Sequence, residues 1–178
     1  VPGYLKQLGY AVTTLDFDAA LGPDVAGDIR SLPLADGSFE LVCAFEVLEH
    51  MPWEESHQAL RELARVSKHS VLISVPHRRT GFELIVKFPF MRSLLGRSFL
   101  RVALLVPVRF RGFASSGQHY WEIDGRSTTL AAFRALLSEY FDIRREQTLP
   151  LDHYRRFFTL HKQHPAHTPS GKTRNKAG

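Results

Sequence analysis

Three side chains that can bind a cofactor or a metal directly follow an apolar run. The run is LVCAF, residues 41–45, and Glu46, Glu49 and His50 come next in the sequence EVLEH. A short apolar run bounded by polar residues is typical of a buried strand. Carboxylates and an imidazole can accept hydrogen bonds, transfer protons or bind a divalent metal. We therefore expect these side chains at the rim of a ligand site.

Polar residues follow other predicted strands in the same way. The strands and their following residues are 11–15 with Asp16, 25–27 with Asp28, 40–45 with Glu46, and 70–75 with His77 after Pro76. Ligands bind at the carboxyl ends of the strands in α/β sheets. Several polar side chains on one rim predict a ligand cleft rather than a set of unrelated helix caps.

The remaining elements complete an α/β pattern. Residues 4–9 predict the end of a helix, and apolar residues at helical spacing predict helices over 53–66 and 128–140. The last two strands are predicted at 141–146 and 157–160, and we interpret 40–45 as a central strand. Strands alternating with helices favour a Rossmann-like, mostly parallel sheet with helices on both faces.

Composition limits the class of protein. The chain has 178 residues and a net charge of +5, concentrated in the middle and at the end. We expect one domain over 1–162 and a basic, disordered tail over 163–178. Cys43 is the one cysteine, so a disulfide framework or a cysteine zinc site within the chain is excluded. A reducing, cytoplasmic location fits this.

Three stretches resemble a known family. VTTLDFD (12–18), GDIRSLPLADGSFELVCAFEVLEHMP (27–52) and LARVSKHSVLISVP (63–76) are similar to class I S-adenosylmethionine-dependent methyltransferases of the type 11 group. The resemblance runs from Tyr4 to about Phe158. It implies transfer of a methyl group from S-adenosyl-L-methionine to an acceptor that the sequence does not identify.

The resemblance assigns roles to single residues. It implies that Asp16 accepts from both ribose hydroxyls, and that Phe17 flanks the adenine. It implies that Asp28 accepts from the adenine amino group, Ile29 covers the ring, and Glu46 lines the methionine end. Catalytic residues stay unassigned, because methyl transfer depends mainly on holding acceptor and methyl group in attack geometry, which supplies about 7–11 kcal/mol.

The EVLEH motif has two interpretations. In some relatives, E-x-x-E-H binds a divalent metal, and His119 lies where small-RNA methyltransferases carry a further ligand. In many others, Glu49 and His50 only order the loop, which is the interpretation that we favour here. His77, His119 and Tyr120 face the methyl acceptor or are ordinary rim residues, and the sequence leaves both open.

A basic and apolar insertion spans residues 78–113. We expect a helical substrate cap with its apolar side on the cleft and its arginines in solvent. The alternative is a peripheral membrane contact through 82–113, since Glu83 is its one acidic residue. The insertion suggests a small-molecule or lipid-like acceptor, and no nucleic acid is expected.

The glycine-rich E-x-G-x-G-x-G loop that opens the family is not in this chain. We expect the first strand of the fold to be missing and the chain to be a fragment that binds cofactor poorly. The alternative is a non-catalytic, methyltransferase-like binding module. A nicotinamide-dependent Rossmann enzyme is disfavoured, because no Tyr-x-x-x-Lys pair accompanies the acidic residue after the second strand.

Overall fold

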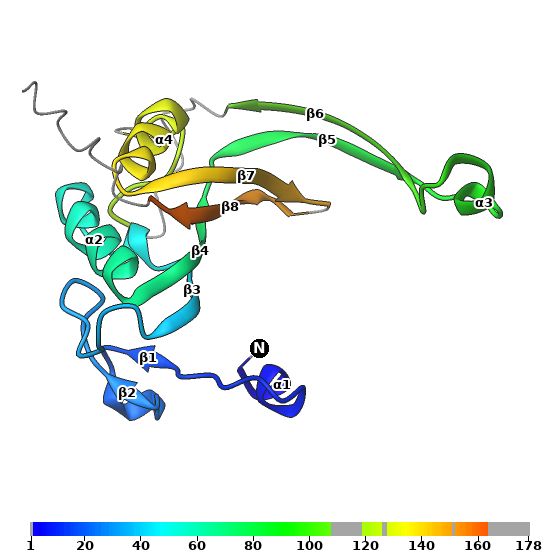
Figure 1. The fold of residues 1–178 in the computed structure, drawn as a ribbon. Helices are drawn as coiled ribbons and strands as arrows, with labels where there is room; N and C mark the ends of the chain where they lie inside the picture. Colours follow the sequence, from blue (N-terminus) through cyan, green and yellow to red (C-terminus); the bar gives the residue numbers. More distant parts are fainter. Residues whose placement is uncertain (1, 108–118, 126–127, 151, 164–178) are drawn as a thin grey trace, which may run out of the picture.

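A mixed four-stranded sheet forms the centre of the molecule (Figure 1). The computed structural model describes residues 2–107, 119–125, 128–150 and 152–163. The strands are ordered β3 (Phe39–Phe45), β4 (Ser67–Pro76), β8 (Asp152–Lys162) and β7 (Phe141–Leu149). β3 and β4 are parallel, whereas β8 is antiparallel to both of its neighbours. The predicted α/β, Rossmann-like fold class is confirmed, but the described sheet is mixed rather than mostly parallel, because β8 runs against both of its neighbours.

The position of β3 differs from the prediction. β3 is an edge strand of this sheet, because β4 is its one partner among the described strands. β1 (Leu15–Asp16) and β2 (Val25–Ala26) form a separate parallel pair. The alternation of β3 exposes Leu41 and Phe45 by nearly half, so the interpretation of 40–45 as a central strand is wrong.

Two helices pack on one face of the sheet. They are α2 (Ser56–Val66) and α4 (Leu130–Ser138), and their buried side chains share one core with alternate residues of β4 and β8. Phe133 of α4 lies 5.3 Å from Phe158, measured between ring centroids, and Phe158 pairs with Ile73 on the same face. We expected helices on both faces of the sheet, but α2 and α4 cover the same face. Leu41 and Phe45 of β3 point to the opposite face and are exposed there by nearly half.

Short elements connect these layers. α1 (Pro2–Gln7) precedes β1, η1 (Ala19–Leu21) separates β1 from β2, and η2 (Leu48–His50) and η3 (Trp53–Glu55) lie between β3 and α2. The hydroxyl of Thr129 accepts from the Ala132 N–H and so caps α4. The helix ends predicted near Gly9, Pro52 and Thr128 therefore fall within a few residues of their observed places.

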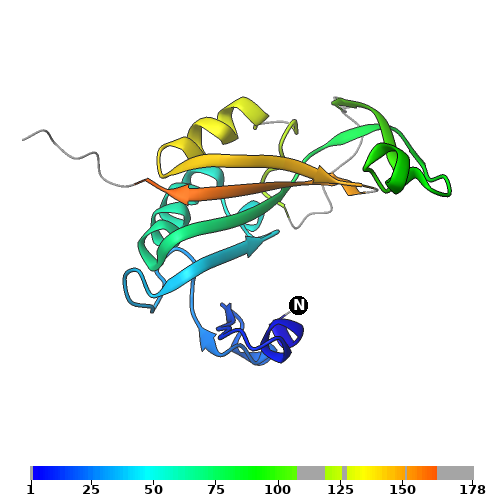
Figure 2. The ribbon, with the colours of Figure 1, turned by 45° about the vertical axis from the view of Figure 1, so that its right-hand side comes forward.

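The insertion is a β-hairpin rather than a helical cap. β5 (Arg79–Val86) and β6 (Leu100–Pro107) pair with each other, and the short helix α3 (Met91–Leu95) joins them. Figures 1 and 2 show the hairpin extending away from α2, with α3 at its far end. The helical cap was expected because the resembling family usually has a substrate cap at this place, but residues 82–86 and 100–104 pair as strands. Residues 108–113, and the tail from 164, lie outside the described residues.

No helix in the described ranges is both long and apolar enough to cross a bilayer.

Candidate functional site

Two of the predicted cofactor residues lie at the same end of the β1–β2 pair. Asp16 is the last residue of β1, and the carbonyl of Asp16 accepts from the Gly27 N–H at 2.9 Å, one residue before Asp28. Because β1 and β2 are parallel, both carboxylates follow carboxyl ends of strands, as predicted. Phe17 is 86% exposed, so its ring is available to a planar ligand. Ile29 packs against the core.

The Asp28 carboxylate is held by a neighbouring guanidinium. Asp28 accepts from the backbone N–H of Arg30 at 2.8 Å and from Arg30 Nε at 2.9 Å. Arg30 also pairs with Glu55 of η3, which fixes the end of β2 to the start of α2. The Arg30 side chain, as a hydrogen-bond donor, lowers the pKa of Asp28, which keeps this carboxylate ionised.

Glu46 is held at the end of β3 in an unusual backbone conformation. Its φ is 54°, in the left-handed region that non-glycine residues rarely adopt. Its backbone N–H donates to the Ser74 carbonyl at 3.1 Å, and its Oε1 accepts from the Ser74 hydroxyl at 2.7 Å. β4 therefore holds both the backbone and the side chain of Glu46.

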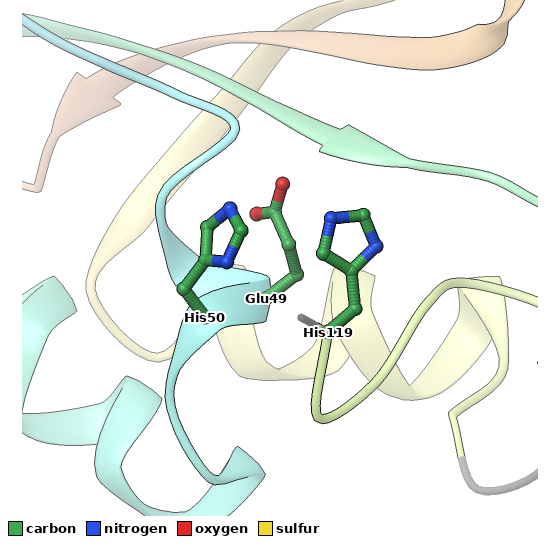
Figure 3. A group of neighbouring side chains, drawn as sticks. All are labelled: Glu49, His50 and His119. Carbon is green, nitrogen blue, oxygen red and sulfur yellow. The ribbon is translucent and has the colours of Figure 1, made fainter. Parts of the chain in front are cut away.

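Glu49, His50 and His119 form a cluster beyond Glu46 (Figure 3). Glu49 and His50 come from η2, and His119 is brought to them by the hydrogen bond from the Tyr120 N–H to the Glu49 carbonyl, 2.8 Å long. One ligand atom of each side chain lies within 4.8 Å of those of the other two. The rings of His50 and His119 meet edge to face, with centroids 4.9 Å apart.

The Glu49 carboxylate is buried without a partner. Its side chain is 0% exposed, and neither oxygen has a hydrogen-bond partner among the residues that the structure describes. Burial is the main cause that raises the pKa of Glu49 to about 7. The residue's own backbone N–H and His119 oppose this rise, whereas Glu46 and Glu122 add to it. An unpartnered buried carboxylate is costly, and this one could be offset by a proton or by a cation.

A second carboxylate holds His119 from behind. Glu122 Oε1 lies 2.9 Å from Nδ1 of His119 and accepts from the Tyr154 hydroxyl at 3.0 Å. This bond directs the Nδ1 proton to Glu122, so that Nε2 of His119 is the ring nitrogen with a lone pair to offer. Burial and Glu122 together raise the pKa of Tyr154, which keeps its hydroxyl protonated as a donor.

The three side chains fit a divalent cation. They combine one carboxylate and two imidazoles, a donor set that suits several divalent transition metals. Metal-bound histidines commonly donate their other ring N–H to a carboxylate, as His119 does to Glu122. Glu46, the first residue of the predicted E-x-x-E-H set, is not part of this cluster. Its carboxylate instead accepts a hydrogen bond from the Ser74 hydroxyl.

His77 belongs to a separate, buried network. Its side chain is 0% exposed, and its Nε2 lies 2.7 Å from Asp124 Oδ2. Nδ1 accepts from Nε of Arg156 at 2.7 Å, so the proton is on Nε2 and the ring is neutral. Of the two readings of the rim histidines, this network gives His77 a structural role. Tyr120, in contrast, is 67% exposed beside the cluster.

Sequence reasoning missed the residues that support the site. Glu122, Asp124 and Tyr154 were not singled out, although the first two lie within a few residues of His119 in QHYWEID. An acidic residue three positions after His119 was the available signal. For Tyr154 the sequence offered none, because the pairing of β8 with β4 is what brings it to Glu122.

The comparisons agree with this fold. Residues 2–75 match the family described as "Methyltransferase domain". No curated protein matches the chain. Many solved structures do, and three follow as examples.

The PH0226 protein from Pyrococcus horikoshii OT3 is 14% identical, with a TM-score of 0.56 over 90% of this chain and 76% of its own. A SAM-dependent methyltransferase from Methanosarcina mazei is 15% identical, with a TM-score of 0.56 over 93% and 88%. The 1,6-didemethyltoxoflavin-N1-methyltransferase of Burkholderia thailandensis, solved with its substrate and S-adenosylhomocysteine, is 16% identical, with a TM-score of 0.57 over 91% of this chain and 65% of that enzyme.

The fold is that of class I methyltransferases, and residues 2–75 match the methyltransferase family. At these identities the solved structures establish the Rossmann-like fold alone, and the family match covers less than half of the chain. The type 11 resemblance predicted from the sequence is thereby confirmed.

Proposed function

We propose that the chain binds S-adenosyl-L-methionine and transfers its methyl group to an acceptor of unidentified chemistry. In this reaction a lone pair of the acceptor attacks the methyl carbon, and the carbon–sulfur bond breaks to leave S-adenosylhomocysteine. The cofactor supplies the reactivity, and the protein supplies binding and orientation. The alternative is a methyltransferase-like module that binds without catalysis.

One observation carries the proposal. In a class I methyltransferase fold, Asp16 and Asp28 follow parallel strands at the same end of the β1–β2 pair. A carboxylate accepts hydrogen bonds without donating, so Asp16 can receive two adjacent ribose hydroxyls. Asp28, held ionised by Arg30, can receive the adenine amino group. The exposed Phe17 ring and Ile29 would flank the base, and Glu46 would face the methionine end.

Titration calorimetry of S-adenosylhomocysteine and S-adenosylmethionine into the 178-residue chain tests this proposal. We expect weak but saturable binding that Asp16→Ala weakens further, at least tenfold, because two charge-assisted hydrogen bonds are lost. The matched control is Asp36→Ala, an exposed loop aspartate that pairs with Arg65. Equal affinity of Asp16→Ala and the unchanged chain would refute the ribose assignment. A folded chain that binds neither compound would favour the non-catalytic module.

A second proposal concerns the cluster of Glu49, His50 and His119. We propose that these three residues bind a divalent cation, with Glu122 as the positioning residue of His119. The supporting observation is the fully buried Glu49 carboxylate without a hydrogen-bond partner. Two of the residues that would bind this cation, Glu49 and His50, closely follow Glu46 in the sequence. The cation would polarise an acceptor hydroxyl or fix its orientation.

Manganese titration at about pH 7.5 tests the cation site without any acceptor. We expect Mn²⁺ to bind with one site per chain. Electron paramagnetic resonance and calorimetry both measure this binding. His50→Ala together with His119→Ala should abolish it, since neutral imidazoles are typical ligands for such ions. The control is His69→Ala, an exposed histidine that lies near Glu40. Unchanged Mn²⁺ affinity in the double variant would refute the site.

A further inference from the structure

One face of the β5–β6 hairpin is an exposed apolar ladder. The strand register pairs Phe82 with Leu104, Leu84 with Val102 and Val86 with Leu100. Residues directly opposite in an antiparallel pair share a face, and alternate residues along each strand do so too. All six side chains therefore lie on one face, which we call the hairpin face. Phe82 is 83% exposed and Leu104 is 71% exposed.

The end of the hairpin continues this apolar surface. Phe88, Phe90, Leu94 and Leu95 are all exposed, Phe90 and Leu94 by 79% each. They lie just before and within α3, at the far end of the hairpin from the core (Figure 1). We call these four residues the hairpin tip. Contiguous exposed apolar surface of this kind marks a site of interaction, because water alone stabilises it poorly.

The positive charge at the hairpin tip has no acidic residue close to it in the sequence. Arg92 and Arg97 are exposed at the tip, whereas Glu83 of β5, the one acidic residue of the hairpin, lies on the face opposite Phe82 and Leu84. From residue 84 to residue 121 the sequence contains no aspartate or glutamate. A surface that presents large apolar side chains together with unbalanced cations fits a partner that is apolar inside and negative at its surface.

The opposite face of the hairpin is the side turned to the body of the domain. Ile85 and Lys87 line a shallow hollow there, together with Phe99 and with Pro150, which directly follows β7. A two-stranded hairpin is at best marginally stable when alone in water. The exposed apolar hairpin face is therefore available for a further contact.

We propose that the hairpin face and tip bind an anionic lipid surface. The phenylalanine and leucine side chains would enter the boundary between headgroups and acyl chains, while Arg92 and Arg97 at the tip pair with lipid phosphates or carboxylates. Long basic side chains suit this arrangement, since their stems lie along apolar surface and their charges stay at the interface. This inference is independent of the methyl acceptor and of the cation site.

Vesicle co-sedimentation of the full chain tests the proposal. We expect binding to vesicles of phosphatidylcholine and phosphatidylglycerol, weaker binding to phosphatidylcholine alone, and release at high salt, because exposed charges are screened. Reversing Arg92 and Arg97 to Glu should lower the affinity for anionic vesicles at least tenfold, because each basic residue near an anionic surface contributes about 1 kcal/mol. The control reverses Arg61 and Arg144, which are also exposed but lie outside the hairpin.

A second variant separates insertion from charge attraction alone. The double variant Phe90→Asp with Leu94→Asp removes two apolar side chains of the tip and should also weaken vesicle binding. The control is Leu8→Asp with Leu21→Asp, at two exposed leucines far from the hairpin, and it should weaken vesicle binding much less. Circular dichroism checks that each variant is folded.

Three results would overturn the proposal: no binding to either vesicle, equal loss in the hairpin and control charge reversals, or self-association through the hairpin that vesicles do not compete with. The last result would assign the surface to a protein partner.

Discussion

Glu122 Oε1 lies 2.9 Å from Nδ1 of His119, so the carboxylate determines which nitrogen of the ring is free to bind a ligand. We predict that Glu122→Gln lowers Mn²⁺ affinity about 10- to 100-fold, the range found when such supporting residues are changed. Calorimetry measures this directly, with the exposed Glu54→Gln as control. Affinity unchanged in Glu122→Gln would show that His119 needs no orienting partner, or is not a ligand.

Glu49 should make the stability of the metal-free protein depend on pH. Its pKa is raised from 4.5 to about 7 in the folded state, so the folded protein binds more protons than the unfolded chain between these values. Stability should therefore fall as pH rises through this window, by about 3 kcal/mol at most. Glu49→Gln should remove this dependence and leave the variant more stable than the unchanged protein at pH about 8.

Urea unfolding at a series of pH values, with and without Mn²⁺, checks this prediction. Manganese should stabilise the unchanged protein at the higher pH and have little effect on Glu49→Gln, because its amide is a much poorer ligand than a carboxylate. A pH profile that is the same in both proteins would contradict the assigned burial of an unpartnered carboxylate.

His77 should affect stability in the opposite direction. Burial is the main cause that lowers its pKa, so the unfolded chain takes up the proton first as pH falls below about 6.5. Stability from the neutral ring is therefore lost as pH falls below this value. We predict that His77→Gln flattens this decline and costs about 1–3 kcal/mol at neutral pH, because Asp124 and Arg156 lose a partner.

The measurement is best made in the Glu49→Gln background, where the opposing contribution of Glu49 is absent. His69→Gln is the control, since His69 is exposed. A decline of the same steepness in His77→Gln would assign the pH dependence to other groups.

Phe133 should carry much of the packing between α4 and the sheet. It is 0% exposed and meets Phe158 and the ring of Trp121, whose centroid is 5.5 Å away. Phe133→Ala should cost about 3–5 kcal/mol in the free energy of unfolding, and Phe133→Leu about 1.5 kcal/mol or less. Urea unfolding measures both. A cost below about 1 kcal/mol for Phe133→Ala would mean that this core is not formed as described.

Much of the fold could be predicted because local signals and burial agree. The apolar runs ending at Phe45 and Pro76, the helix face of Leu60 and Leu63, and the helix within 128–140 all form as expected. The order of strands was less accessible. The edge position of β3 depends on which strands are available to pair, and alternation along 40–45 does not reveal that.

The hairpin and the site show the other limits of the sequence. Residues 82–86 and 100–104 are dense in apolar side chains, so helix and strand patterns are hard to distinguish there, and the antiparallel register decides. At the site, EVLEH and His119 were recognised as candidates, but the carboxylate that holds His119 was not. Its role arises from a bond to Tyr154 on a strand over thirty residues further along.

Glu46 carries a backbone cost that a different residue would avoid. A left-handed conformation costs a non-glycine residue about 1–2 kcal/mol, and glycine adopts it freely. Glu46→Gly would relieve this strain and give up the carboxylate that Ser74 holds. The chain thus trades stability for a charged side chain at the end of β3. Strained residues of this kind concentrate at functional sites. Glu46→Gly is therefore a substitution to avoid in engineering this domain, even if it stabilises the fold.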